Sequence, residues 1–250
     1  MCSMTNNVHG KKIVLPGGAG LVGQNLVISL KDQGYNNITV IDKHSYNLTV
    51  LKKLHPGVSI INDDLSKDGS WKDAFRDASI VVMLQAEIGS KHKDNFRRNN
   101  IDSTVHIIDA MKTYNVSYLV HISSSAVESV ANDDYTITKT EQENIVINNG
   151  LDNVILRPTL MFGWFDRKNL GWLSRFMKRV PLFPIPGSGK YMRQPLYVRD
   201  FCNIIISCLE TRPLSSVYNI SGIEKINYID IIKSIRDVTK SNTIIFKIPF

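Results

Sequence analysis

The sequence predicts an α/β fold with a doubly wound parallel sheet, followed by a smaller C-terminal segment. Short β-branched runs alternate with longer amphipathic stretches, the runs are apolar throughout, and a glycine-rich turn directly follows the first run. Continuous apolar runs are typical of strands buried on both faces, and strands that alternate with helices form parallel sheets. Ligands of such sheets bind beyond the carboxyl ends of the strands, so we expect the chemistry there.

Residues 1–157 are expected to form the core that contains this sheet. Six apolar runs are its expected strands: Lys12–Leu15, Ile38–Ile41, Val58–Ile61, Ile80–Leu84, Tyr118–Ile122 and Val154–Leu156. Five stretches between them are expected helices: Leu21–Gln33, Asn47–Leu54, Trp71–Arg76, Phe96–Tyr114 and Tyr135–Asn149.

The chain changes character after residue 157. Prolines and glycines crowd Pro181–Gly189, which predicts a loop. Two helices, Phe201–Glu210 and Tyr228–Thr239, and a β-rich end, Thr243–Ile248, follow. We expect residues 158–250 to form mainly a small substrate-binding segment, with late strands and helices that return to the core.

The amino-acid composition argues against a disordered protein and against a nucleic-acid-binding protein. The chain has 250 residues, enough for one large domain with an appendage, and 43% of them are hydrophobic, which argues against disorder. The net charge of +7 is dispersed along the sequence, so it predicts no nucleic-acid binding and is equally compatible with an anionic substrate.

The start of the chain does not resemble a signal peptide. Residues 1–10 are polar, and no run approaches the roughly 18 apolar residues of a membrane span, so we expect a cytoplasmic protein. Cys2, Cys202 and Cys208 form no disulfide framework or metal knuckle, and we expect no metal. The abrupt apolar end at Pro249-Phe250 suggests that the native protein continues beyond it.

A glycine pattern and an acidic residue predict a Rossmann-type dinucleotide site. Gly17, Gly20 and Gly23 follow the first strand, where they allow a tight turn, close approach of a pyrophosphate and helix–strand packing. Asp42 ends the second strand, 25 residues after Gly17 (42 − 17). Its carboxylate would bind the ribose hydroxyls and repel a 2′-phosphate, which favours NAD over NADP, although Lys43 would partly offset that repulsion.

Tyr135 and Lys139 open the helix after the fifth strand, and their i, i+4 spacing puts both side chains on one helix face. A free phenol has a pKa of about 10, which makes it a poor proton shuttle at neutral pH, and a neighbouring cation would lower that pKa. Ser123, Ser124 and Ser125 end the fifth strand and would face the same crevice.

Together these motifs resemble the extended short-chain dehydrogenase/reductases, a branch that contains NAD-dependent nucleotide-sugar epimerases and dehydratases. The resemblance spans about residues 11–222 and rests on motifs in the family's order: the three glycines, Asp42, Asp64-Leu65, the serine run, Tyr135 with Lys139, and Leu156-Arg157-Pro158. It implies that Ser124, Tyr135 and Lys139 are catalytic.

The resemblance also implies a set of binding residues. The cofactor NAD would be bound by Gly17, Gly20, Leu21, Val22, Gly23, Asp42, Lys43, Asp64, Leu65, Gln85, Ala86, Asn100, Tyr135, Lys139 and Pro158. Ser125 and Arg193 would bind the substrate, with Arg193 on a nucleotide-sugar diphosphate and Lys168 or Arg175 as weaker candidates. A homodimer is a further expectation.

Three functions stay open. In the first, Tyr135 removes a hydroxyl proton from a nucleotide-linked sugar while a hydride passes to the nicotinamide. An epimerase or simple dehydrogenase is favoured over a dehydratase, because no Asp-Glu pair lies beside the serines. The second function is a reductase or dehydrogenase of a non-sugar hydroxy or keto compound, and the third is a non-catalytic NAD-binding structural protein. The spacing of 11 residues from Ser124 to Tyr135 (135 − 124) is shorter than in most sugar epimerases, but the intact catalytic set argues against the third.

Overall fold

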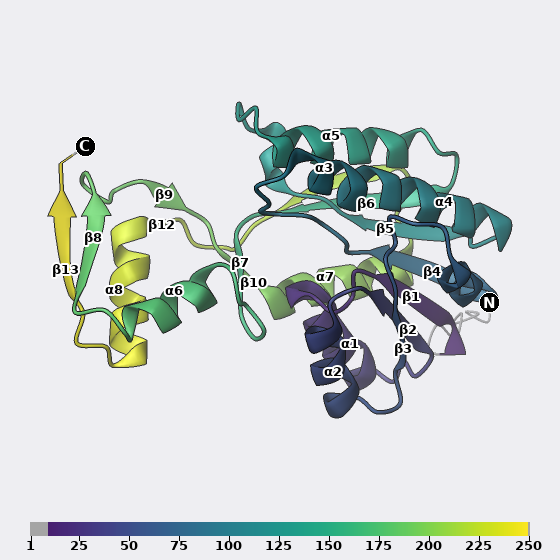
Figure 1. Cartoon of the computed structure of the whole chain (residues 1–250), viewed down its shortest axis with the longest axis horizontal. Helices are drawn as coiled ribbons and strands as arrows, with labels where there is room; N and C mark the ends of the chain where they lie inside the picture. The colour runs from purple at the N-terminus through teal and green to yellow at the C-terminus, as the bar shows by residue number, and fades with distance from the viewer. Residues whose placement is uncertain (1–9, 250) are drawn as a thin grey trace, which may run out of the picture.

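The computed structural model describes residues 10–249, which form a larger lobe and a smaller one (Figure 1). A seven-stranded sheet in the order β11-β6-β5-β4-β1-β2-β3 runs through the larger lobe, and every pair of neighbouring strands is parallel. The strands are β1 (Lys12–Pro16), β2 (Ile38–Asp42), β3 (Ser59–Asn62), β4 (Ala78–Met83), β5 (Tyr118–Ile122), β6 (Asp152–Pro158) and β11 (Ser216–Ile220). The predicted doubly wound sheet is therefore confirmed, and its strand order reverses between β1 and β4.

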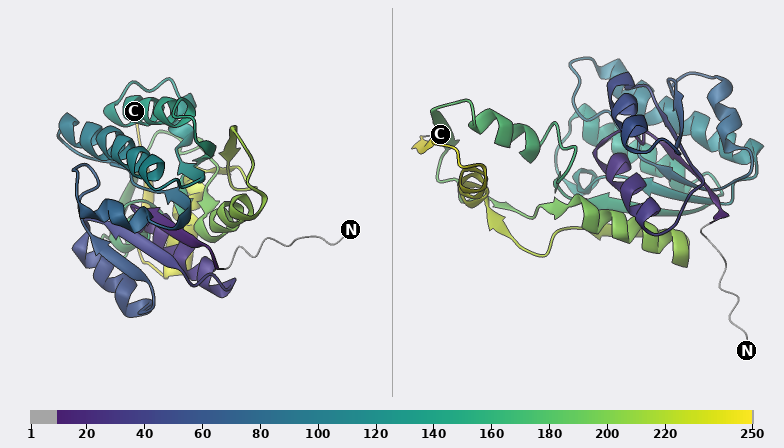
Figure 2. Two further views of the ribbon diagram at one scale, coloured as in Figure 1. Left: turned by 90° about the vertical axis from the view of Figure 1, so that its right-hand side faces the viewer. Right: turned by 90° about the horizontal axis from the view of Figure 1, so that it is seen from below.

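Helices bury both faces of this sheet, which explains the continuous apolar runs. Helices α1 (Leu21–Asp32), α2 (Ser45–Leu54) and α7 (Val198–Thr211) cover one face, and α7 lies along α1 (Figure 2). Helices α4 (Ser103–Thr113) and α5 (Asp134–Ile147) cover the other. On β1, Ile13 and Leu15 pack against the first group, whereas Val14 packs against the second.

Two predicted helices have a different form. The segment expected as Trp71–Arg76 is a 3-10 helix over Ser70–Phe75. The segment expected as Phe96–Tyr114 consists of α3 (Lys93–Phe96), a π-helical turn over Arg97–Asp102, and then α4.

Side-chain hydroxyls stabilise this π-turn. Ser103 Oγ donates to the carbonyl of Asn99 at 2.6 Å, and Thr104 Oγ1 donates to that of Asn100 at 2.6 Å. Such bonds compete with the regular backbone ladder for the carbonyl oxygens. Single π-turns within helices occur often at functional sites.

The smaller lobe corrects one prediction. Residues 181–189 are not all loop, because β8 (Leu182–Pro186) pairs in parallel with β13 (Ile244–Ile248). Phe183 and Ile185 point into a small core shared with α6 (Leu170–Met177) and α8 (Tyr228–Thr239), while the prolines of β8 alternate outward. The β-rich end predicted at residues 243–248 is confirmed.

Short strand pairs lie between the two lobes. They join β7 (Met161–Phe162) to β10 (Leu196–Tyr197), and β9 (Met192–Arg193) to β12 (Ile226–Asn227). The chain crosses to the smaller lobe after β7, returns to the larger lobe for α7 and β11, and then crosses again to α8 and β13 (Figure 1). Of these later elements, β11 completes the main sheet.

Candidate functional site

A cleft of about 430 Å³ lies at the carboxyl ends of the central strands. Twelve of the predicted site residues line it: Gly17, Gly20, Leu21, Val22, Gly23, Asp42, Lys43, Asp64, Leu65, Gln85, Ala86 and Tyr135. The structure thus brings the glycine turn, the acid of β2 and the tyrosine of α5 to one cavity.

The three glycines of the turn have separate roles. Gly17 adopts a φ of +76°, and a Cβ there would lie 2.4 Å from the backbone nitrogen of Gln85. A Cβ on Gly23 would lie 2.2 Å from the carbonyl oxygen of Gly18. At Gly20 the nearest atom would be 3.8 Å away, so the space above the start of α1 is open. No acidic residue lies in the first turn of α1, so this helix N-terminus suits a pyrophosphate.

Asp42 ties the end of β2 to the glycine turn. Its Oδ2 accepts a hydrogen bond from the backbone N–H of Ala19 at 3.0 Å, and its Oδ1 accepts one from that of His44 at 2.9 Å. Each oxygen has a further lone pair that can accept a hydrogen bond from a ribose hydroxyl. The carboxylate is therefore held rigidly at the cleft wall.

Lys43 bridges two loops at the same end of the cleft. Its Nζ donates to Asn99 Oδ1 at 2.5 Å and to Asp64 Oδ1 at 3.4 Å. Burial raises the pKa of Asp64, but hydrogen bonds from Ser66 and the charge of Lys43 outweigh this effect and hold the pKa below its ordinary value. Asp64 therefore stays ionised at neutral pH.

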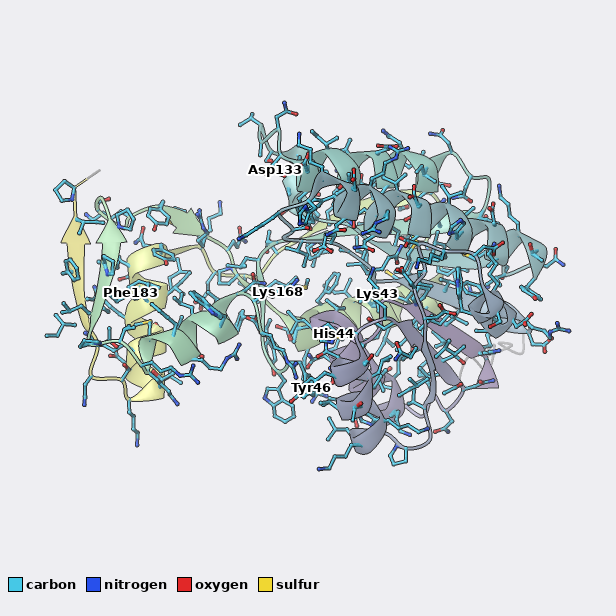
Figure 3. The ribbon with its side chains drawn as sticks, in the orientation of Figure 1. Lys43, His44, Tyr46, Asp133, Lys168 and Phe183 are labelled. Atoms are coloured by element: carbon cyan, nitrogen blue, oxygen red, sulfur yellow. The ribbon has the colours of Figure 1, made fainter. Side chains whose placement is uncertain are left out.

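The loop over residues 163–169 contributes Phe165–Asn169 to the lining of the cleft, and of these the sequence indicated only Lys168. The carboxylate of Asp166 accepts hydrogen bonds from the backbone N–H groups of Lys168, Asn169 and Gly171. Lys168 lines the cleft, as do Lys43 and His44, all three labelled in Figure 3. Arg175, the other weaker candidate for a diphosphate, instead donates to carbonyls of this loop.

Tyr135 and Ser124 are hydrogen-bonded to each other. Burial raises the pKa of Tyr135 above its ordinary value, and the hydrogen bond with Ser124 opposes that rise only in part. The sequence led us to expect a pKa lowered by Lys139. That expectation is wrong for the structure without ligand, because the ammonium of Lys139 points elsewhere.

Lys139 is completely buried behind the tyrosine. Its Nζ donates to the carbonyl of Ile122 at 2.9 Å and to Gln142 Oε1 at 2.6 Å. Burial lowers the pKa of Lys139 to about 7, and the nearby carboxylate of Glu143 opposes this shift. The side chain therefore titrates close to neutral pH.

A partly buried ion network lies beside the serine run. Ser123, which lines the cleft, donates to Glu143, and Arg157 donates to both oxygens of Glu143. Arg157 also bonds Glu128 at 2.7 Å, and Asn219 donates to the same Glu128 carboxylate. These bonds join the ends of β5 and β6 to α5 and β11, and the serine run and the Leu-Arg-Pro motif were the sequence signals at this position.

Six predicted residues, all within the described part of the chain, lie away from the lining of this cleft: Ser124, Lys139, Asn100, Pro158, Ser125 and Arg193. Asn100 is buried, and its Oδ1 accepts from the backbone N–H of Glu87 at 2.7 Å, so it braces the loop after β4. Pro158 ends β6, and Ser125 begins a 3-10 turn. Arg193 lies on β9 with its guanidinium over the ring of Tyr191, 5.0 Å from the ring centroid.

Residues 10–249 contain no group of three or more side chains suited to a metal ion, and none of their helices is long and apolar enough to cross a membrane. Cys202 and Cys208 are buried free thiols on α7, whereas Cys2 lies outside the described residues.

Three known proteins are similar to this chain in sequence. A low-salt glycan biosynthesis protein, Agl12 of Haloferax volcanii, is 25% identical over 86% of this chain and 78% of its own length. A dTDP-glucose 4,6-dehydratase of an Actinoplanes species is 24% identical over 84% and 76%, respectively. A UDP-glucose 4-epimerase of Vibrio cholerae is 23% identical over 80% and 67%.

A solved structure extends the likeness in fold to almost the whole chain. The Bordetella bronchiseptica enzyme WbmF, in complex with NAD+, superposes with a TM-score of 0.84 at 21% identity, over 98% of this chain and 83% of WbmF. The model of the NAD dependent epimerase/dehydratase family matches residues 13–221. The chain therefore belongs to this family of enzymes, whose cofactor is NAD, and the resemblance and cofactor predicted from the sequence are confirmed.

Proposed function

We propose that the protein uses NAD to oxidise or epimerise a nucleotide-linked sugar, with Tyr135 as the group that transfers the hydroxyl proton. The observation that carries the proposal is the position of Tyr135, which lines the same cleft as the glycine turn and is hydrogen-bonded to Ser124. A proton-transferring phenol must reach a substrate held against a dinucleotide, and this cleft is where both would meet.

The residues around the cleft fit NAD. The open space above Gly20 would take the pyrophosphate, and the rigid carboxylate of Asp42 would accept the ribose hydroxyls. Lys43, Asp64 and Leu65 would surround the adenine end, and Gln85 and Ala86 would line the wall between the two ends. The spare donor of Lys139 would reach the nicotinamide ribose, and Asn100 would support that wall from behind.

The cofactor and the side chains have different roles in the proposed reaction. When bound, NAD supplies a hydride acceptor and, in its oxidised form, a positive charge that lowers the pKa of a nearby phenol. Tyr135 takes the proton of the substrate hydroxyl, and Ser124 orients both that oxygen and the phenol. Arg193 and Ser125 would bind the diphosphate and the sugar, respectively.

The relatives named above include both an epimerase and a dehydratase. Loss of water needs an additional acid–base pair, and Glu128 is the first acid after the serine run. Its carboxylate is hydrogen-bonded by Arg157 and Asn219, which orients it toward β6 and β11. This supports epimerisation or simple oxidation over dehydration.

A substrate screen tests the proposal. Purified protein would be incubated with NAD and a panel of UDP- and dTDP-sugars, and the products followed by mass, by NMR and by NADH absorbance. An isomer of unchanged mass without net NADH indicates an epimerase, and net NADH indicates a dehydrogenase. A product lighter by one water would contradict the preference against dehydration. NAD binding without turnover of any sugar, or with turnover that survives Tyr135→Phe, would overturn the proposal.

A further inference from the structure

A series of hydrogen-bonded, buried polar side chains connects Lys139 to the wall of the cofactor cleft. Gln142 Oε1 accepts from Lys139 Nζ at 2.6 Å, and Gln142 Nε2 donates to Thr104 Oγ1 at 2.7 Å. All three side chains have no solvent-exposed surface. Burying an amide and an ammonium is costly unless their hydrogen bonds are made, so apolar side chains would fill this space at lower cost.

Thr104 connects this hydrogen-bonded series to Gln85. Its hydroxyl accepts from Gln85 Nε2 at 3.2 Å and donates to the carbonyl of Asn100 at 2.6 Å, at the end of the π-turn. Gln85 lines the cleft, and its backbone lies against Gly17. The position of Gln142 is therefore fixed by the same segments that form the wall of the cofactor site.

The donors of Lys139 can be counted. An ammonium has three N–H groups, and two of them are used by the carbonyl of Ile122 and by Gln142. The Ile122 carbonyl is fixed within β5, so the second acceptor determines the direction of the third N–H. We propose that Gln142 is a positioning residue, which aims the remaining donor of Lys139 at the cofactor.

Gln142 is the one side-chain hydrogen-bond acceptor of Lys139 among residues 10–249. The carboxylate of Glu143, on the same helix, is already bonded by Arg157 and Ser123. His121, from β5, is fully buried, and burial together with the charge of Lys139 holds its pKa well below the ordinary value. Glu143 is therefore committed to Arg157 and Ser123, and neither ring nitrogen of His121 is hydrogen-bonded to Lys139.

This inference rests on the proposed function, in which Lys139 binds the cofactor. The test compares two variants on α5. Gln142→Leu removes the acceptor of Lys139, whereas Val146→Ala opens a cavity at a buried position that makes none of these side-chain hydrogen bonds. Misplacing a catalytic group by about 1 Å costs up to 10²-fold in rate. We expect Gln142→Leu to lower kcat by about 10- to 100-fold and to weaken NAD binding, whereas Val146→Ala lowers Tm but changes kcat less than about twofold.

Gln142→Glu should shift the pH dependence of NAD binding, which a merely structural role of Gln142 would leave unchanged. A carboxylate at this position restores the acceptor and favours the ammonium, so it raises the pKa of Lys139. Calorimetric NAD titrations across pH should show affinity falling above about pH 7 in the wild type, and at higher pH in the Gln142→Glu protein. Thr104→Val, which removes the partner that holds Gln142, should lower kcat in the same direction as Gln142→Leu and serves in its place if that variant does not fold.

Lys139→Met separates the two proposals. If it abolishes turnover while Gln142→Leu and Thr104→Val behave like Val146→Ala, the positioning role is overturned and the proposed function stands. An unshifted pH dependence of NAD binding in Gln142→Glu would also overturn it. If Lys139→Met and Tyr135→Phe both retain turnover, the proposed function itself fails.

Discussion

The guanidinium of Arg167 lies 4.6 Å from the ring centroid of Tyr46, and this contact joins the two walls of the cofactor cleft. Arg167 belongs to the loop over residues 163–169, and Tyr46 belongs to α2. Arg167→Ala should therefore speed the release of NAD. Cation–π contacts at exposed sites contribute about 0.5–1 kcal/mol, so we expect a two- to fivefold faster dissociation rate by stopped-flow fluorescence. Arg76→Ala, which removes a similar contact with Tyr114 far from the cleft, should leave the rate unchanged.

Asp42→Ala should weaken NAD binding and narrow the preference for NAD over NADP. Hydrogen bonds to a charged group contribute about 1.5–3 kcal/mol, which corresponds to roughly 10- to 100-fold in affinity. Fluorescence titration with both dinucleotides measures the change, and Asp32→Ala is a control with the same change of charge on an exposed residue. A wild-type protein that prefers NADP would contradict our interpretation of the end of β2.

Tyr135→Phe should retain the fold and NAD binding and lose about 10²- to 10⁴-fold in kcat, the usual contribution of a positioned proton-transfer group. Since burial raises the pKa of Tyr135, its phenol in the free protein should ionise above the ordinary value of about 10 in an ultraviolet titration. The pH dependence of kcat reports the ligand-bound enzyme, and there the basic group should titrate well below 10. Identical values in both states would show that ligand binding does not activate the phenol.

Lys139 should make stability depend on pH. Its pKa of about 7 in the folded state lies below the value of about 10.4 in an unfolded chain, so between these values the unfolded state binds more protons. The unfolding free energy of the wild type should therefore rise, relative to that of Lys139→Met, as pH increases from 7 towards 10. Chemical denaturation of both proteins at pH 6, 7.5 and 9 measures this difference, and a constant gap would show that the lysine is not perturbed.

Arg193→Ala should weaken binding of a diphosphate-linked sugar by about 2 kcal/mol, the value of one charge-assisted contact. NAD affinity should stay nearly unchanged, because Arg193 does not line the cofactor cleft. Isothermal titration with NAD and with the sugar nucleotide separates the two effects. An unchanged KM for the sugar nucleotide would remove the main support for this role of Arg193.

The sequence was sufficient for the parts of the fold that local patterns determine. Apolar runs buried on both faces located β1 to β6, and the glycine spacing located the start of α1, because these features depend on neighbouring residues. The π-turn before Ser103 and Thr104 was missed, since hydroxyl-to-carbonyl bonds leave no periodic signal. The strand at residues 182–186 was missed because its prolines favour a loop and its partner lies some 60 residues later.

The same distinction applies to the site. Spacing alone brought attention to Asp42, Tyr135 and Lys139, but the acceptor of Lys139 could not be predicted. Gln142 matters only because α4 brings Thr104 against α5. The assigned roles of the site residues stay predictions, as do the cytoplasmic location and the homodimer.

The π-turn over Arg97–Asp102 also has a consequence for how relatives are aligned with this chain. A π-turn accommodates one residue more than regular α-helix does, and each residue of an α-helix turns the chain by about 100°. Deleting one residue here would leave a continuous helix but rotate its first part relative to Thr104. Asn99 and Asn100 would then lose their hydrogen bonds with Lys43 and Glu87, whereas Thr104 would keep its hydrogen bond with Gln142. A one-residue gap within positions 97–102 of an alignment therefore marks a relative that supports its adenine end differently.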